Sequence, residues 1–212
     1  YDGGPGFDER TITVVETWRF ASANRLAPWW ASTLSAGDGV DDSRSQTAFG
    51  NFTFDTTQRQ YTWQNDFTLP GDAGALTLGI ERREERLATD AAFAVTARDT
   101  DAVFGVWRAR FGDQALQANL RRDDSSQYGG RTTGAVAWGW RVSPHWRITA
   151  GYGTAFKAPT FNDLYYPGFS NPDLVPETSA NVEAAVYATA AWDGVRVDAR
   201  AIGYRNQVER LI

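Results

Sequence analysis

Apolar and polar residues alternate with period two along most of this chain, and that pattern constrains its fold. The clearest stretch runs from Arg131 to Val142, where the even positions carry Thr, Gly, Val, Trp, Trp and Val. Successive side chains of a β-strand point to opposite faces, so the pattern predicts a strand with one apolar face. About ten segments show it: 10–20, 29–37, 60–69, 76–80, 103–111, 116–121, 131–142, 146–157, 181–192 and 195–204. We therefore predict an all-β, antiparallel chain.

The connections between these segments are expected to alternate in length. Short turns are predicted at 70–74, 112–113, 143–144 and 193–194, and Asp193-Gly194 has the composition of a two-residue hairpin turn. Long polar loops are predicted at 38–57, 86–99 and 159–178, with a shorter one at 122–130. Short turns on one rim and long loops on the other are typical of an outer-membrane β-barrel.

No run of 18 apolar residues is present, which argues against a transmembrane helix. A membrane-spanning β-strand needs only about ten residues of alternating polarity. Alternation alone does not separate a membrane barrel from a soluble sheet, whose apolar face meets a core. Strand length, loop asymmetry and Trp residues at strand ends favour the barrel. The alternative is a soluble carbohydrate-binding β-sandwich with Trp and Tyr on its polar face.

Composition narrows the function classes. The formal net charge of -5 disfavours nucleic acid as a partner, since that usually requires a basic patch. The single histidine, His145, adjoins a predicted turn with no nucleophile or paired acid nearby, so we expect a surface residue and no enzyme. The absence of Cys fits an oxidising compartment.

One segment interrupts the alternation, at 151–179: GYGTAFKAPTFNDLYYPGFSNPDLVPETS. Proline cannot donate to a strand ladder, so Pro159, Pro167, Pro172 and Pro176 exclude regular sheet here. The segment is too aromatic for a disordered linker, and we expect an ordered loop between two strands.

The pairing of YGTAFKAPTFNDLYYP with NPDLVPETS resembles the central barrel of TonB-dependent outer-membrane receptors, most closely those of the cobalamin type. DDSSQYG before it and GYRNQVERLI after it occur in the same order in those receptors. The residues that carry the family motif are Phe156, Lys157, Ala158, Pro159, Asn171, Pro172, Leu174, Pro176 and Glu177.

The resemblance implies a barrel of about 22 strands with a plugged lumen, in the outer membrane of a Gram-negative bacterium. Residues 1–212 would be a partial barrel domain that supplies about ten strands, without the plug, the first strands or the closing strands. It also implies the partners: outer-membrane lipid, the TonB complex through the missing plug, and a small-molecule ligand. That ligand would be cobalamin, with a ferric siderophore or another metal chelate as the alternative.

By the same resemblance, the loop at 1–11 could bind ligand. Asp2 and Asp8 would hold calcium, and Tyr1 would lie against the substrate. Calcium prefers several oxygen ligands, so two carboxylates are an incomplete site. The alternative is a solvated Gly/Asp loop.

Three further clusters are interpreted as structural. The acidic cluster at 38–42 is expected in a solvated loop, and the charge run at 81–86 on a strand that continues above the membrane into a solvated loop. The aromatic cluster could touch a ligand, but we expect it to pack the loop. Its members are Phe161, Tyr165, Tyr166 and Phe169.

Overall fold

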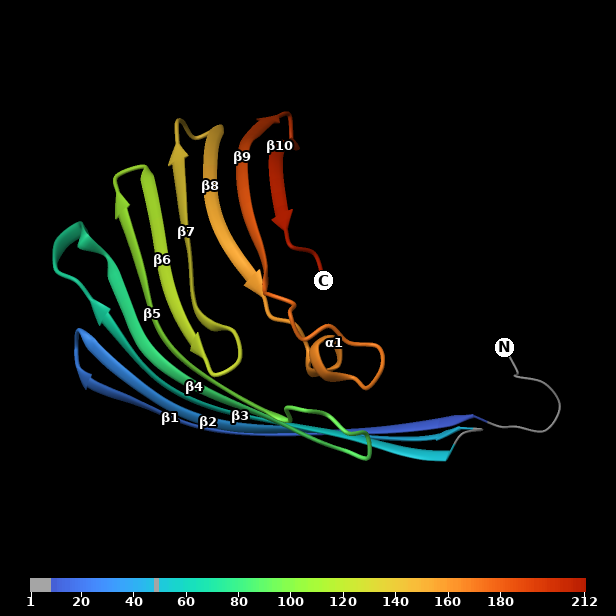
Figure 1. Cartoon of the computed structure of the whole chain (residues 1–212). Coiled ribbons are helices and arrows are strands. Elements are labelled where there is room, and N and C mark those ends of the chain that lie inside the picture. Colours follow the sequence, from blue (N-terminus) through green and yellow to red (C-terminus); the bar gives the residue numbers. More distant parts are fainter. Residues whose placement is uncertain (1–8, 48–49) are drawn as a thin grey trace.

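The computed structural model describes residues 9–47 and 50–212, and these form one ten-stranded antiparallel sheet (Figure 1). Each strand is hydrogen-bonded to the next one in the chain, in the order β1 to β10. The elements are β1 (Arg10–Ala27), β2 (Trp30–Thr47), β3 (Gly50–Thr68), η1 (Gly71–Ala73), β4 (Ala75–Thr89), β5 (Ala97–Phe111), β6 (Gln114–Ser125), β7 (Gly129–Arg141), β8 (Trp146–Lys157), α1 (Phe161–Tyr165), β9 (Glu177–Trp192) and β10 (Val195–Glu209). The predicted all-β class and strand number are confirmed.

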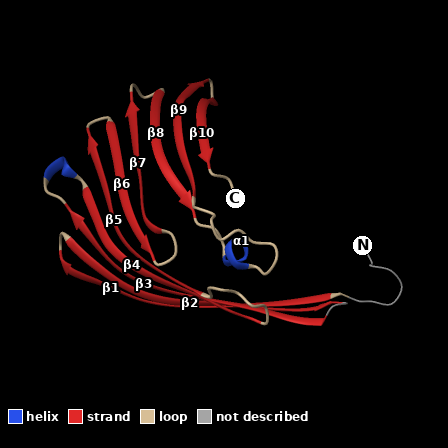
Figure 2. Ribbon diagram, viewed as in Figure 1, coloured by secondary structure: helices blue, strands red, loops and turns tan. Residues whose placement is uncertain are grey.

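The sheet curls into an open trough, with α1 on its concave side (Figure 2). Curling of this kind follows from strand twist and tilt, and it is how a sheet closes into a barrel. A β-sandwich needs two sheets packed face to face, whereas the described part of the chain forms a single sheet. No helix among the described residues is long and apolar enough to cross a membrane.

The two faces of the sheet differ in chemistry. One cross-strand row of paired residues on the convex face is almost wholly apolar: Trp30, Phe67, Leu76, Trp107, Ala118, Val136, Tyr152 and Val182. Large apolar side chains in the neighbouring rows are also exposed, Leu120 at 62% and Val103 at 55%. Polar side chains occupy the concave face, and no packed core lies between two layers of the described sheet.

The hairpin turns form as their composition predicts. Asp193 and Gly194 both have positive φ, 45° and 79°, which is the two-residue turn whose twist matches antiparallel strands. At the β7–β8 connection, Ser143 and Trp146 exchange backbone hydrogen bonds at 3.3 Å. Both turns lie on the rim that also carries the connections at 28–29, 69–74 and 112–113.

The lengths predicted for most of the loops on the opposite rim are wrong. Residues 38–47 and 50–57 are strand, as are 86–89, 97–99 and 122–125, and two of the predicted loops shrink to 90–96 and 126–128. Only the β8–β9 loop (158–176) is as long as predicted. The prediction failed because polar residues occupy both faces of these strand ends, which removes the alternation but leaves the hydrogen-bonded ladder intact.

The acidic cluster at 38–42 therefore lies within β2, and its assignment to a solvated loop is wrong. Asp38 is paired across strands with Arg59, whose Nε lies 2.8 Å from an Asp38 carboxylate oxygen. The charge run at 81–86 is on a strand as predicted, because β4 continues to Thr89. Its loop begins only after that residue.

Candidate ligand-binding site

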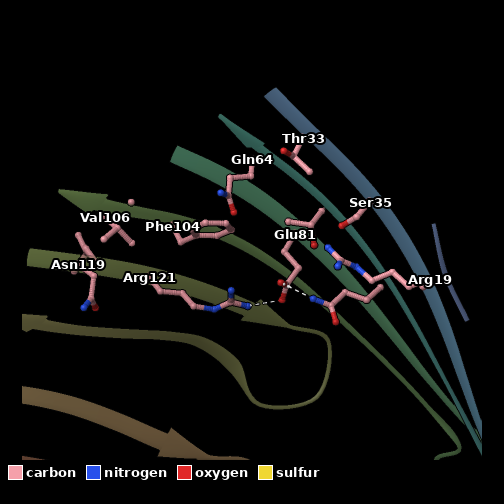
Figure 3. Close-up of a pocket in the computed structure, with 14 residues that line it drawn as sticks. Arg19, Thr33, Ser35, Gln64, Glu81, Phe104, Val106, Asn119 and Arg121 are labelled. Atoms are coloured by element: carbon pink, nitrogen blue, oxygen red, sulfur yellow. Dashed lines mark hydrogen bonds and ion pairs between the residues drawn. The ribbon is translucent and has the colours of Figure 1, made fainter. Parts of the chain in front are cut away.

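A cavity of about 530 Å³, lined by both polar and apolar groups, occupies the concave face over β1 to β6 (Figure 3). Inward-facing residues of consecutive strands line it, because pairing in register brings every second side chain to the same face. The lining includes Arg19, Thr33, Ser35, Gln60, Thr62, Gln64, Glu81, Phe104, Asn119 and Arg121.

Glu81 lies at the centre of the hydrogen bonds in this cavity. One carboxylate oxygen accepts from Arg121 Nη2 at 2.7 Å, and the other accepts from Gln60 Nε2 at 2.8 Å (dashed in Figure 3). Arg121 also donates to the buried carboxylate of Asp123 at 2.8 Å. The chain of contacts joins β3, β4 and β6, so it fixes the positions of these side chains across the wall.

Two nitrogen-bearing side chains of the cavity remain available to a ligand as donors. Among the described residues, neither the guanidinium of Arg19 nor the amide of Asn119 has a side-chain hydrogen bond, and both line the cavity. Phe104 contributes an apolar ring that lies over Gly79, directly opposite it on β4, where any larger side chain would displace the ring. The cavity therefore offers fixed polar groups, free donors and one aromatic face.

The β8–β9 loop is ordered by the start of α1. Thr160 forms a capping box with Asp163: its hydroxyl and backbone N–H donate to the Asp163 carboxylate at 2.7 and 2.8 Å. These two hydrogen bonds, from the backbone and the side chain of Thr160, hold the pKa of Asp163 below its ordinary value. Pro159 and Pro176 at the two ends of the loop are fully buried.

Arg98 ties this loop to the wall. Its Nε and Nη2 each donate to a Glu85 oxygen at 2.8 Å. Its Nη1 donates at 2.9 Å to Gln127 and to the backbone carbonyl of Pro159. The guanidinium also lies 5.3 Å from the centre of the Phe161 ring, and the residue is only 8% exposed.

The aromatic cluster divides into two parts. Phe161 is buried and Tyr165 accepts a hydrogen bond from Gln127 at 3.3 Å, so these two pack the loop as expected. Tyr166 and Phe169 instead are 44% and 89% exposed. The expectation that the cluster packs the loop also holds for Tyr166, whose ring contacts Phe93 of the β4–β5 loop, whereas it is wrong for Phe169, which is largely exposed.

The exposed pair belongs to a row of aromatic rings along the mouth of the trough. Phe54 of β3 contacts Phe93 of the β4–β5 loop at a centroid distance of 6.0 Å. Phe93 contacts Tyr166 at 5.9 Å, and Tyr166 contacts Phe169 at 6.4 Å. Edge-to-face and tilted rings at such distances attract one another, so the row connects three separate segments of the rim.

The family-motif residues meet where β8 and β9 pair. Lys157 lies directly opposite Glu177, with 3.4 Å between Nζ and a carboxylate oxygen, and Phe156 contacts the Tyr128 ring at 5.7 Å. Asn171 caps the turn over Pro172: its side-chain oxygen accepts from Asp173 N at 3.0 Å and its carbonyl from Leu174 N at 3.3 Å. Ala158 follows β8 directly, before the buried Pro159. These residues shape the loop.

The remaining predicted site residues belong to the N-terminal end of the chain. Tyr1, Asp2 and Asp8 lie outside the described residues. Within the described ranges, no group of three potential metal-ligating side chains comes together. His145 is an exposed turn residue whose Nδ1 lies 3.1 Å from the Thr189 carbonyl.

Sequence reasoning missed Arg98, Glu81, Arg121 and the Phe54–Phe93 pair. A signal for one of them was present, since the charge run at 81–86 alternates like any other strand. Glu81, Arg83 and Glu85 share the inward face, and Arg82 faces outward, where it meets Asp99 and Asp101 at 3.2 and 3.1 Å. Reading that run by face would have placed an acid in the cavity.

The fold and the site are those of a section of a transmembrane β-barrel wall. Its inner face is polar, its outer face is apolar, and one ordered loop lies over the concave face. The comparisons agree with this class. The family model described as "TonB dependent receptor-like, beta-barrel" matches residues 1–212. The chain therefore belongs to the TonB-dependent receptor β-barrel family.

Curated relatives of the chain are named more specifically than the family. The chain is 31% identical over 183 residues to the Vitamin B12 transporter BtuB of Photobacterium profundum, covering 85% of this chain and 29% of the relative. It is 30% identical over 172 residues to the protein of the same name from Vibrio cholerae, covering 81% of this chain and 27% of the relative. The chain thus spans under a third of the length of these relatives.

Solved structures share the fold at lower identity. The siderophore receptor PirA from Acinetobacter baumannii matches with a TM-score of 0.72 and 12% identity, over 93% of this chain and 42% of that structure. The FrpB iron transporter from Neisseria meningitidis matches with a TM-score of 0.71 and 15% identity, over 93% and 36%. At such identities the likeness concerns the fold alone.

Proposed function

We propose that this chain is a ligand-binding section of the barrel wall of an outer-membrane receptor that imports cobalamin by a TonB-dependent mechanism. The observation that carries the proposal is the 31% identity to a vitamin B12 transporter over 85% of the chain. The cavity on the concave face is where this chain would contact the ligand.

The exposed convex face supports the membrane location. A contiguous apolar face of this extent is unusual on a soluble protein, whereas lipid chains cover such a face in a barrel. The rim with short turns would face the periplasm, and the β8–β9 loop would lie outside the cell. Contact with the TonB complex would pass through a plug that is not part of the residues described.

The charge of the cavity favours cobalamin over a ferric siderophore. Two arginines, Arg19 and Arg121, are balanced by Glu81 and the neighbouring Asp123. Cobalamin displays peripheral amides, which pair with neutral donors and acceptors such as Asn119 and the glutamines. Ferric complexes of catecholate siderophores are strongly anionic and would require a net cationic wall. A ferric chelate is the second candidate ligand, because solved structures with a similar fold are named as siderophore receptors.

Three expectations stay within this proposal. Asp2 and Asp8 would bind calcium and Tyr1 would touch the ligand, by the family resemblance. The receptor would perform no covalent chemistry, so its work is binding and transport. Nucleic acid is not a partner, as the acidic charge balance suggests.

Isothermal titration calorimetry of the full-length receptor in detergent tests the proposal. Cyanocobalamin and ferric enterobactin are titrated separately, each with and without calcium. We expect saturable binding of cyanocobalamin that tightens with calcium, and no heat with ferric enterobactin. Binding of ferric enterobactin alone would replace the first candidate by the second.

A further inference from the structure

We propose that Arg98 is a positioning residue that holds the β8–β9 loop folded over the concave face and thereby keeps the exposed aromatic pair, Tyr166 and Phe169, at the mouth of the barrel. The effect on ligand capture rests on the proposed function. The effect on the loop does not.

The guanidinium joins three segments that are distant in sequence. Its four hydrogen bonds reach partners 13, 29 and 61 residues away: Glu85 on β4, Gln127 in the β6–β7 turn and Pro159 in the β8–β9 loop. The Phe161 ring on the loop side and the Tyr128 ring on the wall side lie 5.3 and 5.9 Å from it. A planar fork with five donors can satisfy this set, whereas a lysine ammonium cannot.

The loop residues that contact Arg98 are buried, so the contact determines the position of the loop. Pro159 is fully buried and its carbonyl accepts from Arg98, so without that donor a buried acceptor would be unpaired. Phe161 and Leu164 of α1 are 8% and 4% exposed in the same place. The apolar packing of α1 and the polar anchor therefore favour the same folded-in position.

The anchored loop carries the aromatic pair outward. Thr160, immediately after Pro159, is the N-cap of α1, and the capping box fixes the direction of the helix. Six residues after Thr160 the chain reaches Tyr166, which contacts Phe93 across the rim at 5.9 Å. A shift at Pro159 would consequently move the rings at the mouth.

A spin label tests the position of the loop directly. Ser170 is exposed and lies next to Phe169, so it is replaced by cysteine and labelled in the full-length receptor with other cysteines removed. We expect an immobile spectrum in the parent protein and a mobile one in Arg98→Gln and also in Arg98→Lys, since an ammonium lacks the fork. Phe161→Ala removes the ring that packs against the guanidinium from the loop and leaves all charges intact. We expect it to make the label mobile as well, so it serves as the test if Arg98→Gln does not fold.

The matched control is Arg131→Gln, on the same concave face, whose guanidinium donates to the carbonyl of its neighbour Gly130. This variant should leave the label immobile. In parallel titrations, we expect Arg98→Gln to weaken cyanocobalamin binding about 10-fold and Arg131→Gln to change it less than about 2-fold.

An immobile label in Arg98→Gln and Phe161→Ala would overturn the anchoring role. A mobile loop with unchanged affinity for cyanocobalamin would overturn the role in capture. If the parent receptor binds no cyanocobalamin, the proposed function fails, while the label spectra still decide whether Arg98 positions the loop.

Discussion

Side chains at adjacent positions of a strand in this sheet point to opposite faces, one into the cavity and the other to the outer surface. Arg121 points into the cavity, where it joins Glu81 and Asp123, whereas Arg122 points outward and donates to Thr132 at 3.0 Å. Because the strand period is two, one residue of sequence separates a charge inside an ion-pair network from a charge on the outer surface. The two arginines form a natural matched pair for mutation.

We predict that Arg121→Ala lowers the free energy of unfolding by about 3 kcal/mol, because it leaves the carboxylates of Glu81 and the 3%-exposed Asp123 without their cation. Arg122→Ala should change it by less than about 0.5 kcal/mol, as outer-surface substitutions usually do. Denaturant unfolding of the full-length receptor in detergent measures both. Equal effects of the two substitutions would contradict the inward network.

At the same scale, Asp163 gives the loop a dependence on pH. Its pKa is lowered by the hydrogen bonds from Thr160, so the carboxylate stabilises the folded loop above the ordinary carboxyl value near 3.8 and loses that effect as the pH falls through its lowered pKa. We predict that the Ser170 spin label stays immobile from pH 7 down to about pH 4 and loosens below it. Asp163→Asn should abolish this dependence, and loosening between pH 5 and 7 would contradict the assignment.

At the scale of elements, the strands are longer than a membrane requires. β1, β2 and β3 have 18, 18 and 19 residues, whereas a tilted strand crosses the hydrocarbon in about 9–11. Their far ends carry paired charges such as Asp38–Arg59 and Asp42–Arg44 on the convex face. In the proposed orientation these ends stand above the outer surface of the membrane.

The two faces of β6 give a prediction at this scale. Leu120→Arg places a charge on the convex apolar face and should cost about 2–4 kcal/mol if that face meets lipid near the midplane. Asn119→Arg, one residue earlier, faces the cavity and should fold normally. The folded fraction after insertion into lipid vesicles measures both. Normal folding of Leu120→Arg would show that lipid does not cover this face.

The sequence predicted the central part of each strand but not the ends. Where one face is apolar, as from Trp138 to Val142, the alternation is plain. Where both faces are polar, as at Asp41-Asp42, only the pairing of β2 with β3 reveals the strand. The partner of Asp42 is Asp55, 13 residues away in sequence, and no local pattern indicates that pairing.

The site was less predictable than the fold for the same reason. The motif at 156–159 and 171–177 identified the long loop, and the structure confirms that loop. The residue that anchors it, Arg98, lies 61 residues before Pro159 in sequence and has no motif around it. Its role follows only from three-dimensional contacts between β5 and the loop.

At the scale of the whole molecule, the described chain is an open arc whose strands β1 and β10 each have one neighbour. Unpaired edges are unfavourable in lipid, because backbone groups there have no water to bond. In a barrel of about 22 strands, as the family resemblance implies, further strands would pair with these two edges. In this account, polar ligand contacts lie inside the arc and lipid contacts outside it.

The most direct test is a titration of cyanocobalamin into the full-length receptor that carries Arg19→Ala together with Asn119→Ala. These two residues carry free nitrogen donors of the cavity, and we predict that their loss weakens binding at least about 10-fold relative to the parent, while Arg122→Ala on the opposite face leaves it unchanged. Parent-like affinity in the double variant would contradict the claim that this wall binds the ligand.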